Sequence, residues 1–135
     1  MISTKTIEAK FKRAGINPRN TLLWRDVPID LKLKIQANIK VDADESIIIS
    51  FYQSPHYYLL FTTNSLIVSE NYKITKLDYK FIDEIKLNDI FDGDQSKAEN
   101  ELINVFLKSG ASINIKVEKG TWHIIFSILK LLILR

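Results

Sequence analysis

The chain has 135 residues and no cysteine. Without cysteine it cannot form a disulfide framework, a thiolate metal site or a cysteine nucleophile. Histidine is nearly as scarce: His56 and His123 are the only two, and neither lies in a metal-ligand spacing or beside a nucleophile motif. The four glycines are isolated from one another, which excludes a glycine-rich phosphate loop. These absences predict that the protein uses no cofactor and no metal.

Long apolar runs are also missing. The N-terminal stretch Met1–Lys10 has no extended apolar core, so we expect no signal peptide. The most apolar stretch, Trp122–Leu134, is interrupted by His123, Ser127 and Lys130 and is shorter than the ~20 residues that a membrane span needs. We therefore expect a soluble, cytoplasmic protein with no membrane span.

Charge is distributed unevenly along the chain, although the net charge is only +3. Residues 1–40 are rich in Lys and Arg, but no nucleic-acid-reading motif accompanies them, so nucleic acid is an unlikely partner. Residues 83–101 are rich in acids, and the stretch Asp89–Glu101 is interpreted either as a docking loop for a basic protein or as a solvated hairpin loop. The candidate binding residues there are Asp89, Asp92, Asp94, Glu99 and Glu101.

The same loop contains a fragment that resembles a calcium-binding motif, Asp92-Gly93-Asp94. Counted from Asp92, position six is Lys97 rather than glycine, and position twelve is Ile103 rather than glutamate. Because a calcium loop needs both the glycine turn and the terminal bidentate ligand, the fragment predicts a solvated loop and no metal site.

The first 45 residues are predicted to form a helical extension packed on the rest. Ile7 and Phe11 recur at helical spacing, Ser3 or Thr4 can cap the start, and Gly15 suits the end. Leu22-Leu23-Trp24 is interpreted as a short apolar anchor.

The stretch Ile29–Val41 fits two patterns. Its apolar residues fall on every second position, as in a strand, yet Leu31, Ile35 and Ile39 also form a helical stripe. Pro28 suits a first helical turn, so helix is favoured and strand remains open.

Residues 46–117 show seven short runs rich in Ile, Leu, Phe and Tyr, separated by turn residues. This rhythm predicts seven antiparallel strands in a fold that is α+β but mainly β. The runs lie near Ser46–Tyr52, His56–Thr62, Ser65–Ser69, Tyr72–Asp78, Asp83–Asn88, Leu102–Lys108 and Ser112–Val117.

A final apolar helix is predicted to begin after Gly120-Thr121. Trp122, Ile125, Phe126, Leu129, Leu132 and Ile133 form one face, which we expect to close the end of the sheet. Ile124, Ile128 and Leu131 widen this face beyond what closure needs. If they are exposed, they form a patch for association, including self-association through this helix; the alternative is that the N-terminal residues cover them.

Seven antiparallel strands followed by a C-terminal helix resemble the pleckstrin-homology (PH) superfold, which includes bacterial PH-like and GRAM-like domains. Three passages carry the resemblance: Glu45-Ser-Ile-Ile-Ile49, Leu59–Ile67 and Tyr79–Ile85. The resemblance implies a seven-stranded, partly open barrel capped by a C-terminal helix, over residues 46–135 as one unit. The helical extension, residues 1–45, lies outside it.

Membrane-binding members of that superfold bind phosphoinositides with Lys and Arg in and beside the first interstrand loop. Here that loop is Gln53-Ser54-Pro55-His56, which has neither residue. No phosphoinositide is therefore expected, because the cations that would hold its phosphates are missing.

Three functions compete at this point. The favoured one is a non-enzymatic protein-interaction module. The first alternative is an immunity protein that binds and neutralises a cognate bacterial toxin. The second is an uncharacterised enzyme, which would need a cleft with perturbed carboxylates from Asp83, Glu84 or Asp89.

Overall fold

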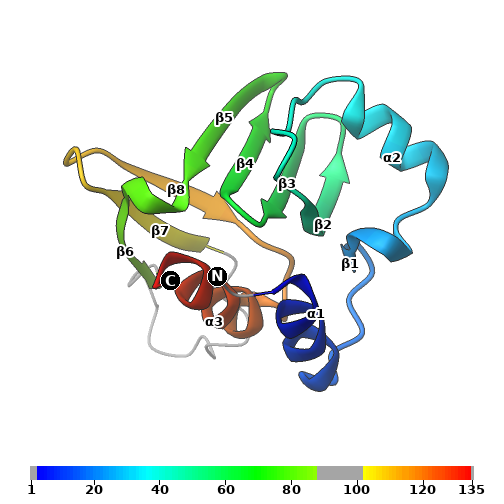
Figure 1. The fold of residues 1–135 in the computed structure, drawn as a ribbon, viewed down its shortest axis with the longest axis horizontal. Helices are drawn as coiled ribbons and strands as arrows, with labels where there is room; N and C mark the ends of the chain where they lie inside the picture. The colour runs from blue at the N-terminus through cyan, green and yellow to red at the C-terminus, as the bar shows by residue number, and fades with distance from the viewer. Residues whose placement is uncertain (1–2, 88–101, 135) are drawn as a thin grey trace.

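Two antiparallel sheets and three α-helices make up the computed structural model, which describes residues 3–87 and 102–134 (Figure 1). The five-stranded sheet has the order β1-β2-β3-β4-β5, and the three-stranded sheet has the order β6-β7-β8. The strands are β1 (Thr21–Leu23), β2 (Ile47–Ser54), β3 (Tyr57–Thr62), β4 (Ser65–Glu70), β5 (Lys73–Asp78), β6 (Ile82–Leu87), β7 (Leu102–Leu107) and β8 (Ser112–Lys116). The helices are α1 (Thr4–Arg13), α2 (Ile29–Gln36) and α3 (Trp122–Ile133), with short 3-10 turns at η1 (Trp24–Asp26) and η2 (Tyr79–Phe81).

The α+β class is confirmed, and the described residues contain eight strands, one more than the seven predicted for residues 46–117. Each of the seven predicted runs contains a strand, and the eighth strand is β1, which lies in the segment interpreted as an apolar anchor. Its three residues are too few to show a period-two pattern. The free edge of β2 makes them a strand, through the register Thr21↔Phe51 and Leu23↔Ile49. The described residues form two separate sheets and no closed barrel.

Helix α1 forms where the spacing of Ile7 and Phe11 predicted it. The Ser3 hydroxyl accepts a hydrogen bond from the Thr6 amide and caps the first turn. Ile7 and Phe11 are buried, and Gly15 leaves the helix with a φ of +68°. In Figure 1 this helix lies beside α3, so the N-terminal extension covers part of the C-terminal helix.

The five-stranded sheet is buried on both faces over much of its length. Side chains alternate between faces along a strand. On the inner face, Phe51, Leu59, Phe61 and Leu66 join the main core, which also contains α1, α3 and the second sheet. On the outer face lies a second, smaller cluster built on Tyr58, Leu60 and Ile67.

Helix α2 covers that outer cluster. Of the two patterns that residues 29–41 fitted, the structure has the helix, from Ile29 to Gln36. The helix runs to Gln36, and its Ile35 is buried against the sheet while Leu31 and Ile39 pack at the edge of the cluster. The alternation that resembled a strand places Ile29 and Leu33 on the solvent side, where they are 66% and 60% exposed.

Tyr57 joins the two sheets. Its hydroxyl donates to the carbonyl of Lys116 (2.9 Å) and accepts from the amide of the same residue (2.6 Å). Burial raises the pKa of the Tyr57 hydroxyl, and the hydrogen bond to the Lys116 backbone lowers it. Burial is the larger effect, so the pKa is about 12. A neutral hydroxyl that both donates and accepts therefore connects β3 to β8.

Glu118 fastens the N-terminal extension to the end of β8. Its carboxylate accepts hydrogen bonds from the amides of Arg19 (2.9 Å) and Asn20 (3.0 Å) and from the hydroxyl of Thr21 (2.7 Å). These three bonds hold the chain where β1 begins, so the position of β1 depends on a side chain almost a hundred residues away.

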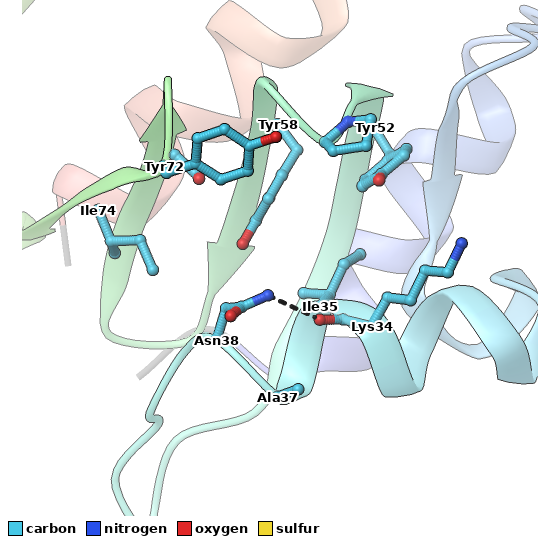
Figure 2. A pocket seen from close by; sticks show the side chains of 10 residues that line it. Lys34, Ile35, Ala37, Asn38, Tyr52, Tyr58, Tyr72 and Ile74 are labelled. Carbon is cyan, nitrogen blue, oxygen red and sulfur yellow. Dashed lines mark hydrogen bonds between the residues drawn. The ribbon is translucent and has the colours of Figure 1, made fainter.

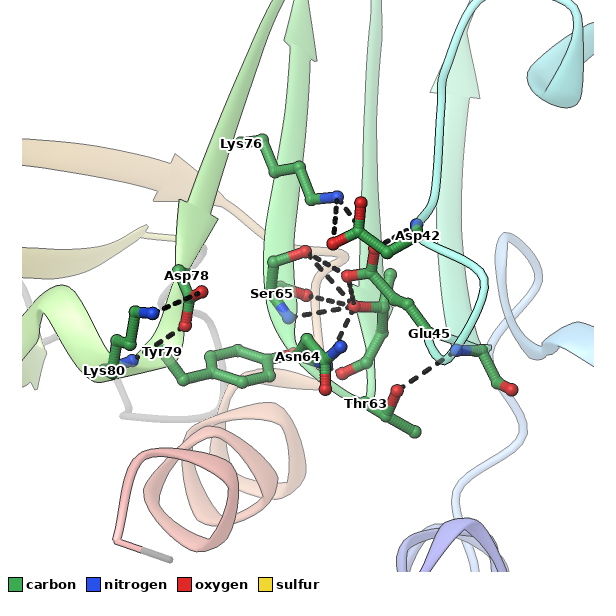
Figure 3. A network of polar contacts seen from close by, with 11 residues as sticks. Asp42, Glu45, Thr63, Asn64, Ser65, Lys76, Asp78, Tyr79 and Lys80 are labelled. Carbon is green, nitrogen blue, oxygen red and sulfur yellow. Dashed lines mark hydrogen bonds and ion pairs between the residues drawn. The ribbon is translucent and has the colours of Figure 1, made fainter.

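Glu45 is the buried carboxylate of the fold, and it lies just before β2 (Figure 3). It accepts bonds from the hydroxyls of Thr62 and Ser65, from the Lys76 ammonium (2.7 Å) and from the Asp42 amide (3.1 Å). Burial acts to raise its pKa, but these hydrogen bonds, led by that of Lys76, lower the pKa to about 2. One side chain thereby connects the ends of β2, β3, β4 and β5.

We predict that Glu118→Ala lowers the free energy of unfolding by about 1–3 kcal/mol, because two amides and a hydroxyl lose a charged acceptor. Glu118→Gln, which keeps one acceptor oxygen, should lose less. Urea titration measures both, and amide hydrogen exchange should rise first at residues 21–23. Glu84→Ala is the control, since the exposed Glu84 carboxylate has a single ion pair among the described residues, with Lys86 at 3.6 Å. Equal losses at the two positions would show that Glu118 does not secure the extension.

We predict that the folded chain loses stability in acid because the buried Glu45 carboxylate becomes protonated. Its pKa in the folded chain, about 2, lies below its ordinary 4.5. The free energy of unfolding that this ionised carboxylate contributes is therefore complete above pH 4.5 and is lost as the pH falls toward 2. The difference between the two pKa values corresponds to about 3 kcal/mol. Urea titrations at a series of pH values test this against Glu45→Gln, which does not titrate and should show a flatter profile. Parallel profiles for the two proteins would contradict it.

Candidate functional site

A groove of about 560 Å³ lies on the outer face of the five-stranded sheet, beyond the C-terminal end of α2 (Figure 2). Its floor is one row of cross-strand neighbours, each paired with the next: Tyr52 with Tyr58, Tyr58 with Ser69, and Ser69 with Ile74. The next row inward, which includes Leu60 and Ile67, lies under α2. The groove is therefore the part of this face that the helix leaves uncovered.

The two walls come from different parts of the chain. Lys34, Ile35, Ala37 and Asn38 at the end of α2 form one wall, and Figure 2 shows them facing the three tyrosines across the groove. The Asn38 amide donates to the Lys34 carbonyl (3.2 Å), which fixes the end of the helix.

The opposite rim consists of the turns that carry Pro55 and Tyr72. The Asn71 amide donates to the His56 carbonyl (2.7 Å), and the rings of His56 and Tyr72 meet edge to face at 5.1 Å. These contacts join the β2–β3 turn to the β4–β5 turn, so the rim is one supported unit.

The five tyrosines of the chain divide into two groups. Tyr57 and Tyr79 are structural, since their hydroxyls bond to the backbone of Lys116 and Thr62. The other three, Tyr52, Tyr58 and Tyr72, all line the groove, and within the described ranges their hydroxyls have no protein hydrogen-bond partner. The only buried unpaired side-chain polar atom found in those ranges is Nε1 of Trp122, so the three hydroxyls are in reach of solvent or a ligand.

Tyr72 holds an unfavourable backbone conformation. It forms, with Asn71, the two-residue turn between β4 and β5, and the φ angles of the two are +67° and +51°. This is a type I′ turn, whose second position is usually glycine. An aromatic residue there costs about 1 kcal/mol, and the Tyr72 ring is nevertheless 72% exposed. The sequence predicted Tyr72 inside a strand, which is wrong: the strand begins at Lys73.

Lys34 is the only ionised side chain that lines the groove. Elsewhere in the described chain, Lys76, Lys80 and Lys86 lie within 4 Å of a carboxylate, whereas Lys34 has no such partner. Burial raises the pKa of the Tyr52 hydroxyl, and the nearby hydroxyls of Tyr58 and Tyr72 raise it further. The groove thus offers neutral hydroxyls, aromatic surface and one cation.

Among residues 3–87 and 102–134 no group of three His, Asp or Glu side chains could hold a metal ion. Among the described lining residues no nucleophile is paired with a base, and His56 on the rim meets the Tyr72 ring and accepts a hydrogen bond from the Asn71 amide through its carbonyl. Asp83 and Glu84, two of the carboxylates considered for an enzyme, are both exposed. Asp89, the third, lies outside the described residues.

The predicted acidic docking loop cannot be placed, because Asp89, Asp92, Asp94, Glu99 and Glu101 all lie outside the described residues. The predicted helix patch is described, and its premise of exposure is not met. Ile124 and Ile128 are 6% and 0% exposed and belong to the main core with Ile7 and Phe11 of α1, while Leu131 is half-buried against it. The N-terminal helix packs against α3. Self-association was predicted from an exposed apolar patch, and these residues do not form one.

No protein-family model matches this chain, and no curated protein matches it either. None of the described helices is long and apolar enough to cross a membrane.

The groove was not predicted from the sequence. The residues that line it come from four strands, two turns and a helix, and only the fold brings these together. One local signal was available: Glu70-Asn-Tyr-Lys73 has asparagine at a hairpin turn but tyrosine where glycine would be expected. A tyrosine at that position is a better indication of function than of folding.

We predict that Tyr72→Gly raises the free energy of unfolding by about 1 kcal/mol, because glycine adopts a φ of +67° without strain. Urea titration measures the change. Asn71→Gly, in the same turn, is the matched control and should change stability less, since asparagine tolerates positive φ. If Tyr72→Gly instead loses more than about 1 kcal/mol, the ring supports the fold and its strain has no functional meaning.

Proposed function

We propose that the chain is a non-enzymatic protein-interaction module with a PH-like fold, and that the tyrosine groove is its binding site. The fold part of the proposal is supported by the element order. Without β1, the chain from Ile47 onward gives seven strands followed by the C-terminal helix α3, which is the outline of that superfold. The passages Leu59–Ile67 and Tyr79–Ile85 lie at a hairpin and at the entry to β6, as the resemblance implies.

The observation that carries the binding proposal is the convergence of Tyr52, Tyr58 and Tyr72 with unpaired hydroxyls. Tyrosine is enriched at protein interfaces and at their energetic centres, because it offers a large rigid ring and a polar tip at low entropic cost. Tyr52 and Tyr58 are stacked, with ring centroids 5.6 Å apart, so the floor is already ordered before any partner binds. Preorganisation of this kind lowers the cost of association.

The strained turn supports the same conclusion. Tyr72 is held at positive φ and is largely exposed, and its ring meets that of His56 on the same rim. Strain of this kind is concentrated at binding sites, where function outweighs stability. The exposed ring at Tyr72 is then the residue that first meets the partner.

The immunity-protein hypothesis is the special case in which the partner is a toxin. It was motivated by the acidic residues 89–101, which fall outside the described residues, so no geometric observation favours it over another protein partner. Coexpression with the product of a neighbouring toxin gene would decide it.

We expect the groove to govern partner capture. Affinity capture from a lysate of the encoding organism, followed by mass spectrometry, should recover a protein with the unaltered chain and with Asn71→Gly. Recovery with Tyr72→Gly should fall about tenfold or more, the loss typical of an aromatic side chain at an interface centre. A photo-crosslinking residue placed at Ala37, on the groove wall, should label the same protein. Equal capture by both turn variants, or no labelling from Ala37, would refute the site.

A further inference from the structure

We propose that the groove binds an extended, acidic segment of the partner protein, with one carboxylate seated at Lys34 and the tyrosine hydroxyls. This inference rests on the proposed function and adds the chemistry of the ligand. It concerns what the groove selects, given that the groove binds a protein.

The charge of the lining is the first argument. Of the described side chains that line the groove, Lys34 alone is charged, and none of them is Asp or Glu. The ammonium of Lys34 has no carboxylate within 4 Å in the described ranges, unlike that of Lys76 on the same sheet face. In Figure 2 the Lys34 side chain rises from the end of α2 on the side of the groove where Tyr52 lies. A carboxylate that enters the groove therefore meets the unpaired Lys34 ammonium, and no described acidic side chain of the lining repels it.

Hydrogen-bond donors are the second argument. Tyr52, Tyr58 and Tyr72 each have a hydroxyl without a protein acceptor, whereas the Asn38 amide is already bonded to the helix end. An ionised carboxylate has several lone pairs and can only accept hydrogen bonds. It therefore complements the tyrosine hydroxyls and the Lys34 ammonium, which can all donate. Hydrogen bonds to an ionised acceptor are shorter and stronger than those to a neutral one.

The dimensions of the floor favour an extended segment. The floor row crosses from β2 to β5, three strand spacings of about 4.8 Å, or about 14 Å in total. An extended chain advances about 3.3–3.6 Å per residue, so about four residues fit across it. Ile35, Ile74 and Pro55 also line the groove, which favours apolar residues next to the acidic one.

Single-stranded nucleic acid is the competing ligand, since tyrosine rings also stack on bases. It is less well matched, because a nucleic-acid groove follows a repeating phosphate backbone with several cations. The lining supplies one lysine, and Tyr52 and Tyr58 stack on each other. An acidic peptide needs no more than one cation.

A random-peptide display library tests the inference directly. Selection on the unaltered protein should enrich peptides with one Asp or Glu beside apolar residues. Selection on Lys34→Glu should enrich Lys or Arg at the same place. Lys108→Glu, an identical charge change in the exposed β7–β8 turn, is the control and should select the same acidic peptides as the unaltered protein. Binding of the best peptide should weaken about tenfold or more in Lys34→Glu and survive in Lys34→Arg.

Location is tested with the same peptide by amide chemical-shift mapping, which should move signals of residues 52, 58 and 72. The inference is overturned if the selected peptides lack acids, if Lys34→Glu selects the same set, if nothing is enriched, or if oligothymidylate binds the groove and peptides do not. Partner capture that still depends on Tyr72 would then leave the interaction function standing with a different ligand. Loss of that dependence would refute the function itself.

Discussion

The buried carboxylate of Glu45 is the constraint on which the arrangement of the outer sheet face depends. A charge at this depth is tolerated only when its oxygens are fully hydrogen-bonded. Satisfying Glu45 requires Thr62, Ser65 and Lys76 to meet at one end of β2, β3, β4 and β5. That end of the sheet is therefore closed by internal contacts, and the segment that leads from α2 into β2 is held beside it. The opposite end of this face has no such network among the described residues.

The groove at that opposite end is the part of the outer face that α2 does not cover. Helix α2 packs with Ile35 over the row of Leu60 and Ile67. It leaves the row from Tyr52 to Ile74 open. Two hairpin turns then supply the far rim, and the strained Tyr72 completes it. Folding requires the covered part to be apolar, whereas the open part combines rings, hydroxyls and one lysine, a composition that supports the proposed interaction role.

Elements with a strong local signal were predictable. The seven strands from Ile47 to Lys116 and the helices α1 and α3 follow from apolar periodicity and from caps such as Ser3, because these depend only on neighbouring residues. Strand β1 was missed because three residues carry no period and their partner lies in β2. The candidate patch on α3 failed for a similar reason: the hydrophobicity of Ile128 is local, but its burial in a core that also contains Ile7 and Phe11 of α1 is not. The groove tyrosines were missed because they converge only through strand pairing.

The sequence by itself determined the α+β class, the strand rhythm of residues 46–117, the apolar closing helix and the lack of a cysteine or clustered-histidine site. Each of these depends on residue identity and short-range spacing, which folding cannot alter. Only the tertiary structure decided which apolar surfaces remain open, because exposure depends on the contacts made by distant segments. It closed the side of α3 that the sequence left in doubt, and it joined Tyr52, Tyr58, Tyr72 and Lys34 into a groove. Periodicity fixes which face of an element is apolar, whereas packing fixes whether that face is a core or a binding site.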